Sequence, residues 1–216
     1  MKPKITVMLV DDHAVVRGGY RLFLSQTGNI DVVCEAARGE EACQLYQDYR
    51  PDVTVMDLNL PGIGGLAALR RIIGRDPAAR VLMFSIHDEL VYVARSLEAG
   101  AKGYITKSCA PEMLVEAVAR IAAGDTFLES ELAQKLAFHG VARGDNSLVA
   151  LNSLSAREFD VFCLLAKGLN TREAAEELQL SFKTVSNYAS VIKDKLNVTS
   201  SVELVRLAYQ FGIIKS

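Results

Sequence analysis

Short apolar runs in the first half of the chain are followed by four residues that can accept or bind a phosphoryl group. Asp11 and Asp12 come directly after one run, and Asp57 and Lys107 each follow another. If these runs are parallel strands, their carboxyl ends share one edge of a sheet, where ligands bind. Three carboxylates that meet there repel one another and need a counter-charge. The set therefore predicts a site for a divalent cation and for phosphoryl transfer.

Each part of such a site has a candidate residue. Mg²⁺, or Mn²⁺ in its place, is bound by oxygen ligands. The expected ligands are Asp11, Asp12, Asp57 and the backbone carbonyl of Asn59. Asp57 would be the nucleophile and become an acyl phosphate, while Lys107 supplies a positive charge and Ser85 a hydroxyl donor. The alternative is that each aspartate is an N-cap or turn residue, which explains one of them alone but not the set.

Strands and helices alternate through the first 124 residues. The apolar runs predict strands at 5–10, 30–36, 52–56, 80–85 and 102–106. Helical spacing between and after them predicts helices at 15–24, 39–46, 65–73, 89–99 and 111–122. This alternation implies right-handed crossovers and a sheet covered on both faces. The predicted fold is an α/β, flavodoxin-like, doubly wound five-stranded parallel sheet.

The same residues carry a resemblance to a known family. Val10-Asp11-Asp12-His13, Met56 to Gly62, Ser85 and Tyr104 to Lys107 resemble the signature of a response-regulator receiver domain over residues 4–124. The resemblance implies that a sensor histidine kinase phosphorylates Asp57. It also implies that Ser85 and Tyr104 switch position, the hydroxyl toward the phosphoryl group and the ring inward. Otherwise Tyr104 is an ordinary edge-strand aromatic.

The rest of the chain has a purely helical pattern. Residues 125–150 are expected to be a linker with a helix at 129–138, and residues 151–216 a small all-α domain of four helices. Ser155 and Glu158 form a capping-box pattern at the start of that domain. Segments 171–178 and 181–196 have the spacing of a helix-turn-helix, in which the second helix enters the major groove of DNA.

The second helix of this pair separates into two faces. Val185, Ala189 and Ile192 recur at helical spacing and should face inward. The residues expected to contact DNA are Lys183, Thr184, Ser186, Asn187, Ser190, Lys193 and Lys195. Among them, Asn187 can bond adenine through both of its polar atoms, and the lysines are placed to meet phosphates.

This half resembles the LuxR/NarL-type DNA-binding domain over about residues 151–213, on the motifs Leu154 to Glu158, Ala166 to Gly168, Lys183 to Val185 and Ile192 to Leu196. The resemblance implies dimerisation through the last helix, at 202–209. The dimerisation candidates are Val202, Val205 and Tyr209, although the pattern alone does not separate core from interface residues there. Ser186, Tyr188, Ser190 and Ser201 stand where the family often has basic or histidine side chains, so tight DNA binding is expected to need a dimer.

Composition limits the remaining possibilities. The chain has 216 residues and a net charge of −2. Residues 151–216 carry eight Lys and Arg against seven Asp and Glu, so DNA binding must depend on local placement of charge. The four cysteines form no CxxC pair, which favours free thiols in a reducing compartment. With neither a signal peptide nor a membrane-spanning run in the sequence, a cytoplasmic location without membrane contact is expected.

Together these patterns predict a transcriptional response regulator of the NarL/FixJ class. Its expected partners are a sensor histidine kinase, double-stranded promoter DNA and RNA polymerase, and it is expected to form a homodimer on activation or on DNA. It would be a phosphoacceptor switch and not an enzyme. One alternative is a hydrolase with Asp57 as a turnover nucleophile, but no cap insertion separates the strands. The other is a regulator that works without phosphorylation, whose usual sign is a broken acidic site.

Overall fold

The computed structural model describes residues 3–142, 151, 153–178, 180–211 and 213–214. The chain forms two compact units. The first comprises Met1–Asp88 with Tyr92–Lys135, and the second comprises Glu89–Val91 with Leu136–Ser216.

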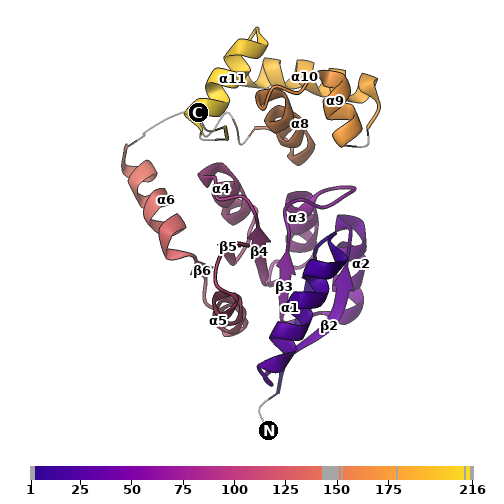
Figure 1. Ribbon diagram of the computed structural model, residues 1–216, viewed down its shortest axis with the longest axis vertical. Coiled ribbons are helices and arrows are strands. Elements are labelled where there is room, and N and C mark those ends of the chain that lie inside the picture. The colour runs from indigo at the N-terminus through magenta and orange to yellow at the C-terminus, as the bar shows by residue number, and fades with distance from the viewer. Residues whose placement is uncertain (1–2, 143–150, 152, 179, 212, 215–216) are drawn as a thin grey trace. The chain divides into compact units, whose positions relative to one another are not determined.

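The first unit is built on a parallel sheet (Figure 1). Its strands in the described part of the chain are β1 (Ile5–Val10), β2 (Ile30–Ala36), β3 (Val53–Met56), β4 (Val81–Ser85), β5 (Gly103–Thr106) and β6 (Phe127–Leu128). They lie in the order β2-β1-β3-β4-β5-β6, and every neighbouring pair is parallel. The chain runs outward from β1 in one direction and then outward from β3 in the other. The carboxyl edge between β1 and β3 is therefore the switch point at which such sheets bind ligands.

Helices cover both faces of this sheet. They are α1 (Ala14–Gln26), α2 (Gly39–Tyr49), α3 (Gly65–Arg75), α4 (Leu90–Glu98) and α5 (Pro111–Ala122). Val7 and Leu9 alternate with residues of the opposite face along β1, and they share one core with Leu24 of α1 and Leu114 of α5. Helices α2 and α3 pack against each other, and α2 also contacts β1 and β2. The predicted doubly wound α/β fold is confirmed.

The sixth strand is a correction to the five-stranded prediction. β6 pairs with β5, with Gly103 opposite Phe127 and Tyr104 opposite Leu128. A Cβ on Gly103 would lie 2.5 Å from the carbonyl oxygen of Phe127, so a glycine is what lets the two strands approach. A two-residue strand has no periodicity to detect. The first unit consequently continues beyond Gly124 into the segment that was expected to be a linker.

The second unit is helical. Helix α6 (Ser130–Ala142) begins in the first unit and runs into the second, and residues 143–150 of the predicted linker lie outside the described residues. The other helices are α8 (Ala156–Ala166), α9 (Thr171–Glu177), α10 (Phe182–Leu196) and α11 (Ser201–Gln210). Across the described parts of both units, no helix combines the length and apolarity that crossing a bilayer demands.

Side-chain caps fix the starts of these helices. Ser155 with Glu158 forms a complete capping box at α8, as the sequence predicted. Asn170 and Ser200 form the equivalent boxes at α9 and α11. The Ser181 side chain accepts a hydrogen bond from the Thr184 amide at α10. Such caps stabilise a helix by about 1 kcal/mol each.

Candidate functional site

Lys107 joins two of the three predicted carboxylates at the carboxyl edge of the sheet. Its Nζ atom lies 2.5 Å from an oxygen of Asp11 and 2.6 Å from an oxygen of Asp57. All three side chains are largely buried, and that of Asp57 is only 4% exposed. Residues that are 96 and 50 positions apart are thus brought into direct contact, as the sequence predicted for strand-end residues.

Backbone hydrogen bonds between neighbouring strands set the positions of these side chains. The Asp11 amide donates to Ala36 O just beyond the β1–β2 pairing, and the Asp57 amide donates to Val10 O. The Lys107 amide donates to Ser85 O at the end of β4. Each residue therefore follows its strand at the same level of the sheet, and the parallel register itself assembles the cluster.

Burial and pairing act in opposite directions on these charges. Burial raises the pKa of the Asp57 carboxyl above its usual value, although the hydrogen bond and positive charge of Lys107 oppose this effect. For Lys107, burial acts to lower the pKa, but the hydrogen bonds and charges of Asp11 and Asp57 outweigh it and the pKa is raised. A carboxylate so enclosed depends on its cationic partner, because an unpaired charge there would be costly.

Asp12 lies beside this ion pair with a different partner. Its carboxylate lies 2.7 Å from Nδ1 of His13, which is the N-cap residue of α1. Ligand atoms of Asp11, Asp12 and His13 all lie within 4.8 Å of one another. The donor set at this edge is dominated by carboxylate oxygens, with Asp57 close by, and therefore fits a hard cation such as Mg²⁺.

The two predicted switch residues meet at His87, whose importance the sequence did not reveal. Ser85 Oγ accepts a hydrogen bond from the His87 amide, and the Tyr104 hydroxyl donates to His87 O at 2.8 Å. The His87 ring lies within hydrogen-bonding distance of the Asn59 amide and stacks on Tyr92. Tyr104 is fully buried, and because β6 covers β5, it does not lie on an edge strand. A loop histidine gives no sequence signal for such a role.

Two further residues at this edge were missed by sequence reasoning. Arg17 donates from Nη1 to Asp11 O at 2.5 Å and pairs through Nε with Glu35. Glu129 accepts hydrogen bonds from both the amide and the hydroxyl of Thr106, the residue before Lys107. The position of Arg17, one turn into the helix after the acidic pair, could have indicated a role at this edge. The position of Glu129 could not, since its role depends on β6.

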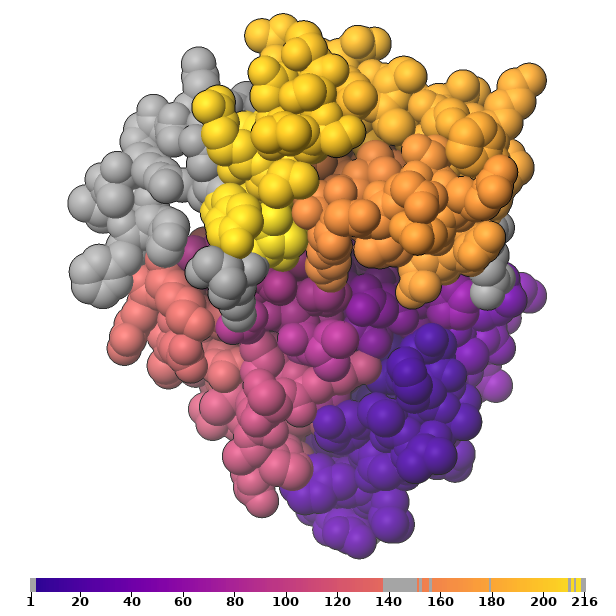
Figure 2. Space-filling model, turned by 45° about the horizontal axis from the view of Figure 1, so that its top comes forward, coloured from indigo at the N-terminus to yellow at the C-terminus, as the bar shows by residue number. Residues whose placement is uncertain are grey.

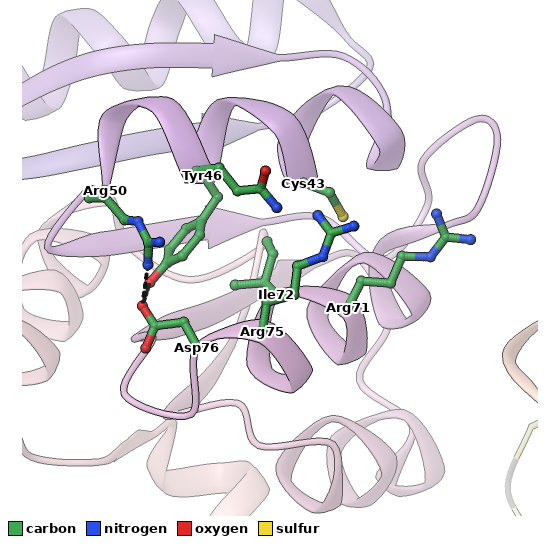
Figure 3. Close-up of a pocket in the computed structure, with 8 residues that line it drawn as sticks. Cys43, Tyr46, Arg50, Arg71, Ile72, Arg75 and Asp76 are labelled. Atoms are coloured by element: carbon green, nitrogen blue, oxygen red, sulfur yellow. Dashed lines mark hydrogen bonds and ion pairs between the residues drawn. The ribbon is translucent and has the colours of Figure 1, made fainter.

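A small pocket between α2 and α3 lies apart from the acidic edge (Figure 3). It is lined by Cys43, Tyr46, Gln47, Arg50, Arg71, Ile72, Arg75 and Asp76. Arg50 and Arg75 lie at the C-terminal ends of their helices, where positive charge is favoured by the helix dipole. Burial, with the hydrogen bond to Asp76, raises the pKa of Tyr46 to about 12, and burial also raises the pKa of Cys43. Helix stabilisation and packing thus explain why these residues line the pocket. None of the groups considered is an activated nucleophile.

In the second unit, α10 divides into the two predicted faces. Val185 and Ile192 are fully buried, and Ala189 is half-buried between them. Lys183, Asn187 and Ser190 are exposed, whereas Ser186, Thr184 and Lys193 are half-buried. Figure 2 shows the side chains of α10 and α11, in gold and yellow, at the surface of this unit. The inward stripe predicted from the sequence is confirmed.

Lys195 has a partner that the sequence did not suggest. Its Nζ atom lies 2.7 Å from a carboxylate oxygen of Glu158 and donates to Ser153 O at 3.1 Å. The Glu158 carboxylate also accepts from the Ser155 amide as part of the capping box. Lys195 therefore ties the end of α10 to the start of α8, and its ammonium group is already engaged.

The structure distinguishes core residues from exposed residues among the apolar side chains of α11, which the sequence alone did not do. Leu204 is buried in the core. Val202 is 77% exposed and Tyr209 is also exposed, while Val205 is half-buried. Val202, Val205 and Tyr209 are spaced at i, i+3 and i+7, so they share one side of the helix.

Known proteins resemble this chain along almost its whole length. Residues 7–119 match the response regulator receiver domain, and residues 152–208 match the luxR family of bacterial regulatory proteins. The transcriptional activator protein ExaE of Pseudomonas putida is 45% identical over 211 residues, which cover 97% of this chain and 98% of that protein. Response regulator UvrY of Escherichia coli K12 is 37% identical over 209 residues, covering 97% and 95% respectively.

A solved structure agrees with these matches. The crystal structure of a two-component response regulator of the LuxR family from Aurantimonas sp. SI85-9A1 is 44% identical, with a TM-score of 0.62. It covers 64% of this chain and 99% of its own. The receiver match alone spans more than half of the sequence, and a luxR match follows it in the same chain. The chain therefore belongs to the transcriptional response regulators of the NarL/FixJ family, which join a receiver domain to a LuxR-type DNA-binding domain.

Proposed function

We propose that a sensor histidine kinase phosphorylates Asp57 and that this modification controls binding to promoter DNA. The observation that carries the proposal is the buried contact of Lys107 with both Asp57 and Asp11. A lysine held at hydrogen-bonding distance from a strand-end carboxylate is positioned to neutralise a phosphoryl group attached there. In this proposal the protein is a cytoplasmic phosphoacceptor switch and not a turnover enzyme.

The transfer step forms one bond and breaks another. A carboxylate oxygen of Asp57 attacks the phosphorus of a phosphohistidine, the N–P bond breaks, and its electron pair returns to the imidazole. The product is an acyl phosphate on Asp57. Mg²⁺, or Mn²⁺, would neutralise developing charge, held by Asp11, Asp12, Asp57 and the Asn59 carbonyl.

The switch proposed here acts through Ser85 and Tyr104. A phosphoryl group adds about −1.5 to −2 charge and new acceptor oxygens, toward which the Ser85 hydroxyl can turn. The same hydroxyl now accepts from the His87 amide, and His87 O holds the Tyr104 hydroxyl. A movement of the Ser85 hydroxyl would thus occur next to the hydrogen bond that holds the Tyr104 side chain inside. Strand β5 carries Tyr104 and leads directly into Lys107.

In the proposed output, α10 contacts the promoter DNA and α11 forms the dimer contact. Asn187 and Ser190, with Ser186 beside them, would face base edges, and Lys183 and Lys193 would meet phosphates. Thr184, whose hydroxyl lies 2.8 Å from that of Ser181, would add a contact at the helix start. Val202, Val205 and Tyr209 would form the homodimer contact along α11.

Substitution of Asp57 tests the site. Asp57→Asn should abolish incorporation of phosphate from a kinase or from acetyl phosphate, because an amide cannot form the acyl phosphate. Asp31→Asn is the matched control, since Asp31 is an exposed strand aspartate of the same unit. Incorporation that is unchanged in Asp57→Asn would overturn the assignment.

Substitution on α10 tests the output. Asn187→Ala should weaken binding to the selected promoter site by about 1–3 kcal/mol and leave binding to random DNA nearly unchanged. Lys183→Met should weaken both equally and reduce the salt dependence by about one unit of slope. Equal losses on both DNAs for Asn187→Ala would refute base reading by this residue.

A further inference from the structure

The first residue of α10 is a large aromatic side chain that is left in water. Phe182 is 57% exposed, directly after the Ser181 cap. The buried side of the helix is formed by Val185, Ile192 and Leu196. Phe182 stands three residues before Val185 and so continues that stripe by helical spacing, yet it is exposed at the first turn of the helix. Leaving an aromatic ring in solvent forgoes stabilisation that burial would give.

The position of Phe182 places it among the proposed DNA contacts. At 3.6 residues per turn, Ser186 and Lys193 fall on the same side of α10 as Phe182, about one and three turns further on. Lys183 follows it directly. Val191, the other exposed apolar residue of this helix at 38%, lies about two and a half turns away and so on the opposite side.

We propose that Phe182 is a specificity-determining residue whose ring contacts the C5-methyl group of a thymine in the major groove. The proposal rests on the proposed function, in which α10 enters that groove. The N-terminal residues of a recognition helix approach base edges most closely, and apolar side chains read the thymine methyl group. The polar side chains of Ser186 and Asn187 make hydrogen bonds and do not sense a methyl group. Phe182 therefore adds a type of readout that the polar residues of α10 lack.

The spacing along the helix sets where this thymine lies. Phe182 and Asn187 are five residues apart, a rise of about 7.5 Å. Successive base pairs rise by about 3.4 Å. The thymine read by Phe182 should accordingly lie within about two base pairs of the position whose preference depends on Asn187.

Replacement of thymine by uracil tests the proposal, because it removes the methyl group and leaves the pairing edge unchanged. A duplex selected from random DNA by the full-length phosphorylated protein is remade with uracil at each thymine in turn. One substitution should weaken binding by about fourfold, the factor that corresponds to about 0.8 kcal/mol for one buried methyl-sized group. In Phe182→Ala that duplex and its thymine parent should bind equally well, and fluorescence anisotropy measures each pair.

Matched variants separate this reading from other roles of an exposed ring. Val191→Ala removes an exposed apolar group from the opposite side of α10 and should retain the fourfold methyl effect. Phe182→Leu should retain part of it. If Phe182 instead serves a protein contact, Phe182→Ala weakens binding while the methyl effect persists, and the proposal is overturned.

The remaining outcomes are also decisive. A protein that selects a specific sequence but is insensitive to every uracil substitution overturns the role of Phe182 alone. A protein that selects no specific sequence overturns the proposed function as well.

Discussion

The Lys195–Glu158 contact predicts that one of the lysines expected to bind DNA instead stabilises the helical unit. The Glu158 side chain is 10% exposed and that of Lys195 is 36% exposed. Lys195→Met would remove the 2.7 Å charge-assisted hydrogen bond to Glu158 and the bond to Ser153 O. The Glu158 carboxylate would remain enclosed with only its capping-box partner.

The expected loss of stability is about 2 kcal/mol. Breaking a fully buried ion pair costs about 3–5 kcal/mol, and a hydrogen bond to a charged group contributes about 1.5–3 kcal/mol. The lower range applies because Lys195 is partly solvated and Glu158 keeps its bond to the Ser155 amide. For a domain of this size, 2 kcal/mol corresponds to a fall in Tm of about 10 °C.

Hydrogen exchange measured by mass spectrometry on peptides from α8 and α10 reports this loss within the full-length protein. Lys193→Met is the matched control, because Lys193 lies in the same last turn of α10 and shares its helix-dipole contribution. A double-mutant cycle with Glu158→Gln isolates the pair itself.

DNA binding provides the second readout. Lys195→Met should leave the salt dependence of DNA binding nearly unchanged, whereas Lys183→Met should reduce it by about one unit of slope. The reasoning is refuted if Lys195→Met leaves exchange in α8 and α10 unaltered and reduces the salt slope as Lys183→Met does.

Three further changes have defined outcomes. Gly65→Ala should destabilise the first unit by about 1–3 kcal/mol and slow phosphorylation, because its Cβ would overlap the Asp57 carbonyl; urea unfolding and acetyl phosphate kinetics measure both effects. Burial acts to raise the pKa of Glu158, but hydrogen bonds from Lys195 and Ser155 outweigh it and hold the pKa below its usual value. This stabilisation is present above the unfolded pKa of about 4.3 and is lost as pH falls through the folded pKa. The urea midpoint of Glu158→Gln should therefore depend less on pH below about pH 4 than that of the unsubstituted protein. Glu129→Ala should accelerate exchange at Thr106 and the start of α6 without reducing phosphate incorporation, and a matching loss of incorporation would contradict it.

The acidic edge was predictable because its geometry follows from the strands. Asp11, Asp57 and Lys107 each follow an apolar run, and a parallel sheet brings such residues to one edge whatever their separation in sequence. The core side of α10 was predictable for a similar reason, since Val185 and Ile192 obey the helical period. Periodicity thus carries tertiary information wherever one element has one buried side.

The features that escaped prediction depend on contacts between distant elements. Lys195 has the sequence position of a phosphate-binding residue, but its ammonium group meets Glu158, which is 37 residues away. The role of His87 comes from its backbone, whose amide and carbonyl join Ser85 and Tyr104. Position along the chain says nothing about either contact, so only the folded chain reveals them.

The hydrogen bonds of Glu129 have a consequence for the energetics of signalling. They fasten the segment that leads into α6 to Thr106, next to Lys107. If phosphorylation of Asp57 alters promoter affinity through this tie by some factor, thermodynamic linkage requires promoter DNA to alter the equilibrium of phosphorylation by the same factor. Occupied promoters would then act as effectors of the receiver, and where phosphorylation tightens promoter binding, the phosphorylated fraction at equilibrium would rise with the concentration of specific DNA.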